Sequence, residues 1–442
     1  MTTEELKRKA GEAIDQNRQT IIDTAQAIWR EPEEGYCEYK TAQKIEEVFR
    51  SMEIPYQKGL AVTGVKGLLQ GEQEGPTVCV MGELDAVCNP DHPEADAETG
   101  MVHACGHFTQ LAWLIGATFG VKAVINALAG RVALFAVPAE EYLNLELRQR
   151  LKDEGKIKYF GGKQELVRIG AFDDIDIAIM AHAFSRDPGK SVFIPSSSNG
   201  FIGKSARFLG KTAHAGFAPD KGINALNACN LAFSAIHAQR ETFRDEDCVR
   251  VHPIITQGGK GVNNVPHDVR TEMYVRAKTI DAIQDANAKV DRALKAGAMG
   301  IGTRVEITNT PGYLPLVQDE RLNDLWVQNS NELIGSENVH FIGHNGGSTD
   351  MGDITQLLPG IHPFIGGFKG DMHGSDFQIG DEEMAYMLPA KLYAMTVIDL
   401  LSDGAKTAKQ VLQNFTPIVT KDAYLKLLDS LEYTLLWSEN GG

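Results

Sequence analysis

Cysteine, histidine and acidic residues gather at the ends of several predicted strands and before a late predicted helix. They are Glu83, Asp85, Cys105, His107, Glu140, Glu141, His182 and His373. Thiolate, imidazole and carboxylate groups are the side chains that bind divalent transition ions such as zinc and manganese. Each residue alone has an ordinary explanation, because a lone histidine is more often hydrogen-bonded and a lone cysteine is more often packed. Their shared position at strand ends favours a metal centre.

The acidic doublet Glu140–Glu141 suggests what such a centre would do. It directly follows the apolar run RVALFAVPA at 131–139, and two acids at the end of a buried strand need a cation or another partner. One carboxylate can bind a metal while its neighbour takes the proton from metal-bound water. The doublet therefore indicates hydrolysis.

Alternating helices and strands must position these residues. Helices are predicted at 3–30, with Thr2 or Thr3 as the cap, and at 40–53, and strands are predicted at 62–70, 76–84, 131–139 and 175–183. Apolar strands that alternate with helices indicate an α/β sheet covered on both faces. Ligands of such sheets bind beyond the carboxyl ends of the strands, which is where the polar residues fall.

A smaller unit follows the Ser/Asn/Gly cluster at 195–200. Its predicted order of strand, helix, strand, strand, helix and strand matches the ferredoxin-like split motif. Helix–strand alternation then resumes. The expected architecture is a mixed-sheet α/β catalytic domain formed by 1–198 and 313–442, with an inserted ferredoxin-like α+β domain at 199–312.

Composition excludes several functional classes. The 442 residues are 43% hydrophobic and 23% charged, as expected for a folded protein of two domains. A net charge of −16 disfavours nucleic acid as a partner, and no apolar run predicts a membrane span. The charged N-terminus does not read as a secretory signal, and the six cysteines lack paired spacing, so a reducing, cytoplasmic location is expected.

Short motifs occur in a set order along the chain. They are HACGH at 103–107, PAEE at 138–141, KTAHAG at 211–216 and GGSTDMG at 346–352. This series resembles the aminoacylase/carboxypeptidase family of co-catalytic metallopeptidases, in its amidohydrolase branch and nearest to aminobenzoyl-glutamate hydrolase subunits. The resemblance covers nearly the whole chain. It implies a small-molecule substrate and an inserted domain that serves as a lid and joins a homodimer.

The resemblance also implies roles for individual residues. Two divalent ions per subunit, manganese or zinc with cobalt or nickel as alternatives, would be held by Cys105, His107, Glu141, His182 and His373. Glu140 would be the general base, and Asp85 would orient a ligand. His214 would reach the site from the inserted domain, in this family commonly across a dimer interface, to donate to the developing oxyanion. Asn263 and Arg276 would anchor the substrate, since the planar fork of arginine suits a carboxylate.

Four departures from the family pattern bear on the substrate. Phe108 stands where the family often has Asp or Asn, and the segment 86–102 is longer than in near relatives. At His182 the sequence AHAF replaces a histidine–proline pair, and 142–163 looks specific to this chain. The departures bear on the identity of the substrate and leave the catalytic residues in place.

The predicted reaction is hydrolysis of the amide bond in an N-acyl or aminobenzoyl amino acid or a small dipeptide. The alternative is a metal-dependent aminohydrolase that releases ammonia from a substituted aromatic amine. A non-catalytic binding protein is disfavoured because no member of the residue set is missing. A serine nucleophile is disfavoured because the sequence has no G-x-S-x-G motif.

Overall fold

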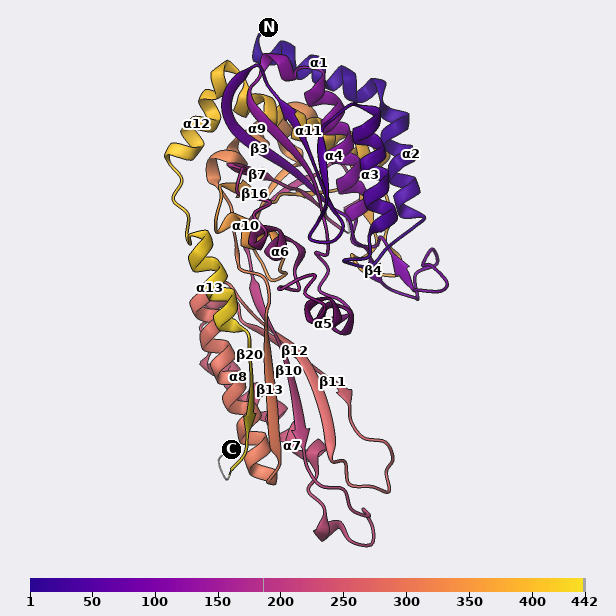
Figure 1. Cartoon of the computed structure of the whole chain (residues 1–442), viewed down its shortest axis with the longest axis vertical. Coiled ribbons are helices and arrows are strands. Elements are labelled where there is room, and N and C mark those ends of the chain that lie inside the picture. The colour runs from indigo at the N-terminus through magenta and orange to yellow at the C-terminus, as the bar shows by residue number, and fades with distance from the viewer. Residues whose placement is uncertain (186, 440–442) are drawn as a thin grey trace. The chain divides into compact units, whose positions relative to one another are not determined.

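The protein forms two compact units in the computed structural model, which describes residues 1–185 and 187–439 (Figure 1). Unit 1 contains 1–196, 317–343 and 353–419. Unit 2 contains 197–316, 344–352 and, among the described residues, 420–439. The chain therefore passes between the units several times.

Unit 1 is built on a mixed six-stranded sheet. Its order is β1 (Tyr56–Leu60), β2 (Gly64–Gln70), β6 (Ala129–Val137), β3 (Gln73–Glu83), β7 (Ile177–Ile179) and β16 (Gly360–Ile361). Strands β6, β3, β7 and β16 are parallel, and β1 and β2 continue the sheet in antiparallel pairs. Glu83 lies opposite Val137 in the β3–β6 pair, so the polar residues after both strands leave the sheet at one edge.

Helices pack around this sheet. The main ones are α1 (Thr3–Gln16), α2 (Arg18–Trp29), α3 (Tyr39–Ser51), α4 (His107–Lys122), α9 (Glu320–Ile334), α11 (Leu388–Leu401) and α12 (Lys406–Gln413). Helix α4 packs on β3 and is flanked by α1, α2 and α11, which explains why it is apolar on nearly every side. Thr2 caps α1 in a capping box with Glu5, as predicted. The sequence predicts a single helix at 3–30, which is wrong. The helix ends before Asn17, whose side chain donates to the carbonyl of Ala13, and a second helix begins after it.

Helix α11 follows a π-helical turn at Glu383–Met387. Pro389 has no N–H for the carbonyl of Ala385, and the indole of Trp113 donates to that carbonyl at 2.7 Å. Glu383–Leu401 is long and apolar enough to cross a membrane, with a mean hydropathy of 1.3, but 89% of this window is buried inside the protein. These contacts make it a core helix of unit 1.

The strand predicted at 175–183 is split between two sheets. Strand β7 ends at Ile179, and β8 (His182–Ala183) pairs with β17 (Phe364–Ile365) in a second sheet. Pro363 lies between β16 and β17 and has no N–H to continue the ladder. His182 therefore stands on a short separate strand, where its N–H donates to the carbonyl of Pro363 at 2.9 Å.

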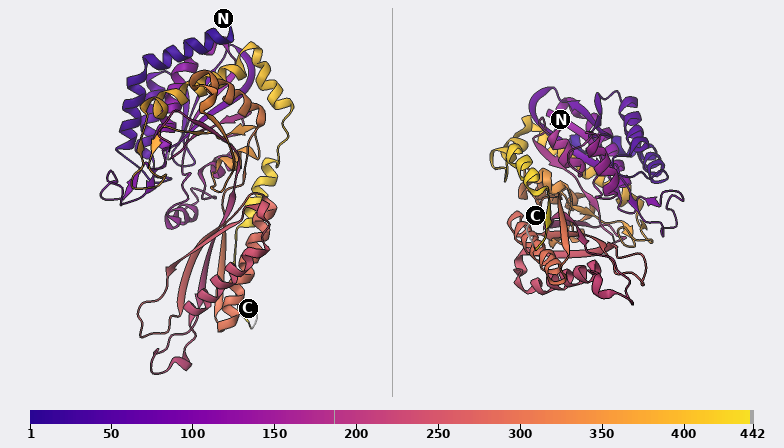
Figure 2. Two further views of the ribbon diagram at one scale, coloured as in Figure 1. Left: turned by 180° about the vertical axis from the view of Figure 1, so that it is seen from behind. Right: turned by 60° about the horizontal axis from the view of Figure 1, so that its bottom comes forward.

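Unit 2 is an antiparallel sheet with two helices on one face (Figure 2). The strand order is β11 (Arg250–Gln257), β12 (Asp268–Ala277), β10 (Gly200–Leu209), β13 (Arg304–Pro311) and β20 (Tyr433–Trp437). The helices are α7 (Ala225–Ala238) and α8 (Ile280–Ile301). The first four strands and these helices have the predicted ferredoxin-like order.

The last described strand departs from the predicted organisation. Strand β20 pairs with β13, so 420–439 lies in unit 2, as does 344–352, although the sequence predicts both segments as parts of the large domain, within 313–442. A single short strand does not specify which sheet it joins, since its partner lies far back in the chain. The α/β unit with an inserted α+β unit is otherwise the architecture that was predicted.

Candidate metal centre

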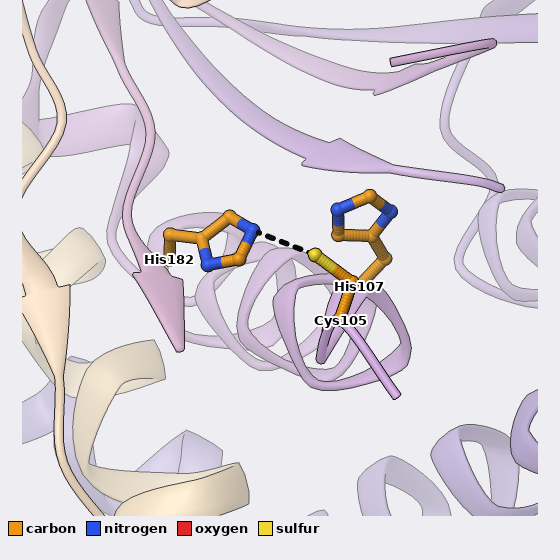
Figure 3. Close-up of side chains that lie close together, drawn as sticks. All are labelled: Cys105, His107 and His182. Atoms are coloured by element: carbon orange, nitrogen blue, oxygen red, sulfur yellow. Dashed lines mark hydrogen bonds between the residues drawn. The ribbon is translucent and has the colours of Figure 1, made fainter. Parts of the chain in front are cut away.

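The start of helix α4 places Cys105 and His107 close together. Gly106 between them is the N-cap, with φ 91°, and a Cβ there would lie 2.6 Å from the Cβ of Ala183. Glycine is required by both the backbone conformation and the space. Figure 3 shows Cys105 and His107 facing His182, whose Nε2 lies 3.4 Å from the sulfur of Cys105.

Five predicted ligands form two groups of three that share Cys105. Within each group the ligand atoms lie within 4.8 Å of one another. The first group is Cys105, His107 and His182, and the second is Cys105, Glu141 and His373. In the second group His373 Nε2 lies 3.2 Å from the sulfur of Cys105 and 3.1 Å from Glu141 Oε1.

Hydrogen bonds orient the two buried histidine rings. His107 Nδ1 donates to the carbonyl of Asp85 at 2.9 Å, and His182 Nδ1 donates to that of Ala183 at 2.9 Å. Nε2 of His107 is buried and lies 3.1 Å from the carboxylate of Glu83. Metal-binding histidines are usually fixed through the other ring nitrogen in this way. The thiolate, imidazole and carboxylate donors therefore fit two divalent ions.

Protons balance the charge of this cluster when no metal is bound. Burial and Glu141 oppose ionisation of Cys105, but three histidines lower the pKa of its thiol to about 6. Burial likewise disfavours the charged form of His373, yet Cys105 and Glu141 raise its pKa to about 11. Metal binding must displace these protons, so metal affinity decreases as the pH falls.

Two further carboxylates lie next to the ligands. Asp85 Oδ2 accepts the N–H of Glu141 at 2.8 Å, and Asp85 Oδ1 lies 3.3 Å from His107 Nδ1. Asp85 thus contacts the backbone of one predicted ligand and the ring of another. Glu140 belongs to a third group with Glu83 and His107, again with candidate ligand atoms within 4.8 Å. The acid proposed as the base is therefore next to the metal-ligand cluster.

Glu83 is among the polar residues at predicted strand ends, but the sequence analysis assigns it no role in the site. Its carboxylate accepts from Gln110 Nε2 at 2.9 Å, lies 3.1 Å from His107 Nε2 and pairs with Lys163 at 2.7 Å, all in the protein interior. Burial opposes its ionisation, but Lys163 and His107 hold the pKa of Glu83 below its usual range. Its place two residues before Asp85 was a usable signal, whereas nothing in the sequence pointed to Lys163.

A buried acid, Glu38, holds the turn before the acidic doublet. Its Oε1 accepts the N–H of Ala139 at 2.7 Å, and its Oε2 accepts from the hydroxyl of Thr63 at 2.6 Å. Ala139 has φ 55°, in the left-handed region, which costs free energy for a residue other than glycine. Glu38 thus stabilises the strained turn from which Glu140 and Glu141 project.

Glu38→Gln is expected to change how stability depends on pH. Burial and then repulsion by Asp85 raise the pKa of Glu38 from 4.5 to about 8. The folded protein therefore keeps a proton that the unfolded chain releases, and wild-type unfolding free energy should fall by up to about 1.4 kcal/mol per pH unit across that interval. Glutamine cannot ionise and lacks this loss, so the variant should gain stability relative to wild type at pH 9 and not at pH 4.

Urea denaturation of the metal-free proteins at both pH values measures this difference. Glu72→Gln, in an exposed loop, is the matched control and should follow the wild type. A wild-type pH profile shared by Glu38→Gln would contradict the prediction.

His214 lies in unit 2 with its side chain exposed. Its Nδ1 accepts the N–H groups of Gly216 and Phe217 at 3.2 and 3.0 Å, and Asn263 Nδ2 lies 3.4 Å from its Nε2. With Nδ1 as an acceptor, the neutral ring carries its proton on Nε2, which is the tautomer that an oxyanion donor needs. The structure brings His214 and Asn263 together, and their catalytic roles stay predictions.

Arg276 also lies in unit 2, on strand β12. Its guanidinium donates to the hydroxyl of Ser348 at 2.8 Å and lies over the rings of Phe201 and Tyr274, 5.3 and 5.2 Å from their centroids. These contacts hold the guanidinium beside the GGSTDMG motif at 346–352. Its role as a substrate anchor stays a prediction.

Phe108 and His103 flank the ligand loop but point into the core. Phe108 is 1% exposed, and its ring centroid lies 4.8 Å from that of Trp29 and 6.2 Å from that of Tyr386. Burial and then His107 lower the pKa of His103 to about 3. We therefore assign Phe108 to aromatic packing, and His103 to a neutral structural role.

The fold and this residue cluster define an α/β metallohydrolase with an inserted α+β domain. The chain belongs to peptidase family M20/M25/M40, whose model matches residues 79–390. The Xaa-Arg dipeptidase of Mus musculus is 27% identical over 415 residues, which cover 90% of this chain and 89% of that protein. A p-aminobenzoyl-glutamate hydrolase component from Escherichia coli is 26% identical, with coverage of 69% of this chain and 60% of that protein.

A solved structure shares the fold. It is a dinuclear metal-binding peptidase of the M20 family from Bacillus subtilis, with a TM-score of 0.66 at 19% identity, covering 87% of this chain and 98% of that one. The predicted family and fold class are thereby confirmed, and the chain is a hydrolase of the M20 family.

Proposed function

We propose that this protein hydrolyses the amide bond of an N-acyl amino acid or small dipeptide with two bound metal ions. The observation that carries the proposal is the pair of ligand groups joined through Cys105, with the candidate base Glu140 beside them. Membership of the M20 family supports the same reaction class. Bound metal ions would lower the pKa of the attacking water and polarise the scissile carbonyl.

The chain's own residues would move the protons and stabilise charge. Glu140 would take a proton from the attacking water and return it to the leaving nitrogen. Asp85 would keep His107 and Glu141 in place through the contacts described above. His214 would donate from Nε2 to the developing oxyanion, a contribution of about 3 kcal/mol for one well-placed donor.

A pocket in unit 1 beside two ligands supports a more specific substrate. It is lined by Phe184, Ser185, Asp187, Phe193, Asp371 and Met372. The rings of Phe184 and His182 both lie close to that of Phe364, with centroids 5.7 and 6.1 Å away, and Met372 adjoins His373 in sequence, so the pocket lies near two proposed ligands. Aromatic faces and carboxylates attract cations. We propose that it takes a basic side chain of the substrate, and the activity named for the mouse relative supports this.

A pair of substrates that differ in one charge tests this proposal. Dipeptides ending in arginine and in citrulline have nearly the same shape, so only the cation distinguishes them. We expect kcat/KM to favour arginine by roughly 5–30-fold, corresponding to about 1–2 kcal/mol. Asp371→Asn should reduce this preference, whereas equal turnover of both dipeptides would contradict the basic-substrate proposal.

A wider panel tests the reaction class. It contains N-acyl amino acids, dipeptides, aminobenzoyl-glutamate and substituted aromatic amines, with products read by mass spectrometry. An acid and an amine as products support amide hydrolysis. Ammonia released from an aromatic amine, without a new acid, would support the aminohydrolase instead.

We further propose manganese or zinc as the native metal, a cytoplasmic location and a homodimer. The mixed thiolate, imidazole and carboxylate donors support these metals.

In unit 2, edge strand β11 exposes Ile254 and Ile255, which are 51% and 40% exposed, and an open edge can pair with another chain. Sedimentation of the purified protein measures the oligomeric state, and a monomer at all concentrations would contradict the dimer.

A further inference from the structure

The two ligand groups differ in how they are supported. Cys105, His107 and His182 are all buried within the core of unit 1. In the second group the side chains of Glu141 and His373 are 11% and 50% exposed. An exposed ligand must lose more conformational freedom on binding unless its backbone is already held. The contacts that hold Glu141 and His373 are therefore important for the second metal position.

His373 is held at both its N–H and its carbonyl. Its φ is 62°, in the left-handed region, and its N–H donates to the carbonyl of Ala104 at 2.9 Å. Its carbonyl accepts from Asn89 Nδ2 at 2.8 Å. Asn89 belongs to the segment 86–102, and its own Oδ1 accepts the N–H of Asp91 at 3.1 Å, which orients the amide. This segment therefore anchors an exposed ligand in an unfavourable backbone conformation.

Glu141 is held at its carbonyl by Arg148. The guanidinium of Arg148 is 1% exposed and donates to the carbonyls of Glu141, Leu143 and Phe160. It also lies over the ring of Tyr36, 5.2 Å from the centroid. A buried guanidinium is tolerated only when its donors are satisfied, so these carbonyls and Arg148 fix one another. Arg148 lies on α5 (Leu145–Asp153), within the segment 142–163.

We infer that Asn89 and Arg148 are positioning residues for the second metal ion, and that 86–102 and 142–163 set its affinity. Asn89 donates to the carbonyl of His373, and Arg148 donates to the carbonyl of Glu141. In the first group, the ring nitrogens Nδ1 of His107 and His182 are instead held by carbonyls of buried residues. Loss of either donor should therefore weaken one metal position and spare the other. The inference rests on the ligand set proposed above.

Calorimetric titration of Zn²⁺ into the metal-free protein tests the inference. Asn89→Asp removes the Nδ2 donor to the carbonyl of His373 and keeps the oxygen that accepts the N–H of Asp91. Arg148→Met removes the guanidinium but keeps an unbranched side chain. We expect the weaker of two binding steps to lose about 10–100-fold in affinity, as is typical when a group that supports a ligand is lost. The tighter step should not change. His373→Ala identifies which step belongs to the second group.

Controls come from the same segments. Thr99→Val in the loop and Arg150→Met on α5 change residues that form no hydrogen bond with a proposed ligand in the described part of the chain. Both should titrate like the wild type. Circular dichroism checks folding, and Arg148→Lys replaces Arg148→Met if the latter does not fold.

Activity adds a second readout. Asn89→Asp should lose turnover at limiting Zn²⁺ and regain it at excess, which a general loss of structure would not allow. Unchanged affinity in both variants, or equal weakening of both steps, would contradict this inference alone. A wild-type protein that binds a single Zn²⁺ would instead contradict the dinuclear centre on which it rests.

Discussion

Glu140→Ala is expected to bind both metal ions and to lose turnover by roughly 10²–10⁴-fold, the usual contribution of a general acid–base group. The reason is the division of the acidic doublet. Glu141 belongs to a ligand group with Cys105 and His373, whereas Glu140 lies with Glu83 and His107. Removing the base leaves the five proposed ligands intact, so metal content and KM should change little while kcat falls.

Glu141→Ala is the matched comparison, because it removes the neighbouring carboxylate. It should reduce metal content, and excess metal should restore part of its activity. Excess metal should not restore Glu140→Ala. Elemental analysis and steady-state kinetics on both variants separate the two roles. Full activity in Glu140→Ala, or loss of metal from it, would contradict the assignment of this residue as the base.

The sequence predicts that most of the candidate ligands gather at one edge of the sheet, because they follow predicted strands or begin a predicted helix, whereas the ligand set itself comes from the family resemblance. Strands β3 and β6 are parallel and in register, which carries Asp85 and the acidic doublet to one edge of the sheet. His182 does not follow a strand of the main sheet directly, because it stands on the separate strand β8, near Pro363. Its predicted position beyond a strand end still agrees with the structure, since β8 begins at His182, shortly after β7 ends at Ile179.

Residues that support the ligands were harder to predict. Glu38 lies far back in the chain from the Ala139 N–H that it accepts, and Lys163 pairs with Glu83 across a similar separation. Such pairs depend on how distant segments pack, and a single sequence carries no periodicity for them. The same reason explains why β20 was predicted in the wrong unit: a short strand has no local signal for its partner.

Cys105→Ser is expected to reduce the metal content of the purified protein from two ions per chain to below one. Cys105 is the member common to both ligand groups, with its sulfur 3.4 Å from His182 Nε2 and 3.2 Å from His373 Nε2. A serine hydroxyl stays protonated near neutral pH, whereas the neighbouring histidines lower the pKa of the cysteine thiol to about 6. Loss of this ligand should weaken binding by more than the roughly 10–100-fold that follows loss of a supporting group.

Single-histidine variants provide the comparison that makes this result specific. His182→Ala and His373→Ala each remove a ligand from one group and should leave about one ion per chain by elemental analysis. Cys88→Ser replaces an exposed cysteine outside both groups and should keep two. A Cys105→Ser protein that keeps one ion would mean that the groups bind metal independently. Loss of both ions in Cys105→Ser, against one in each histidine variant, requires that the two positions share the sulfur of Cys105.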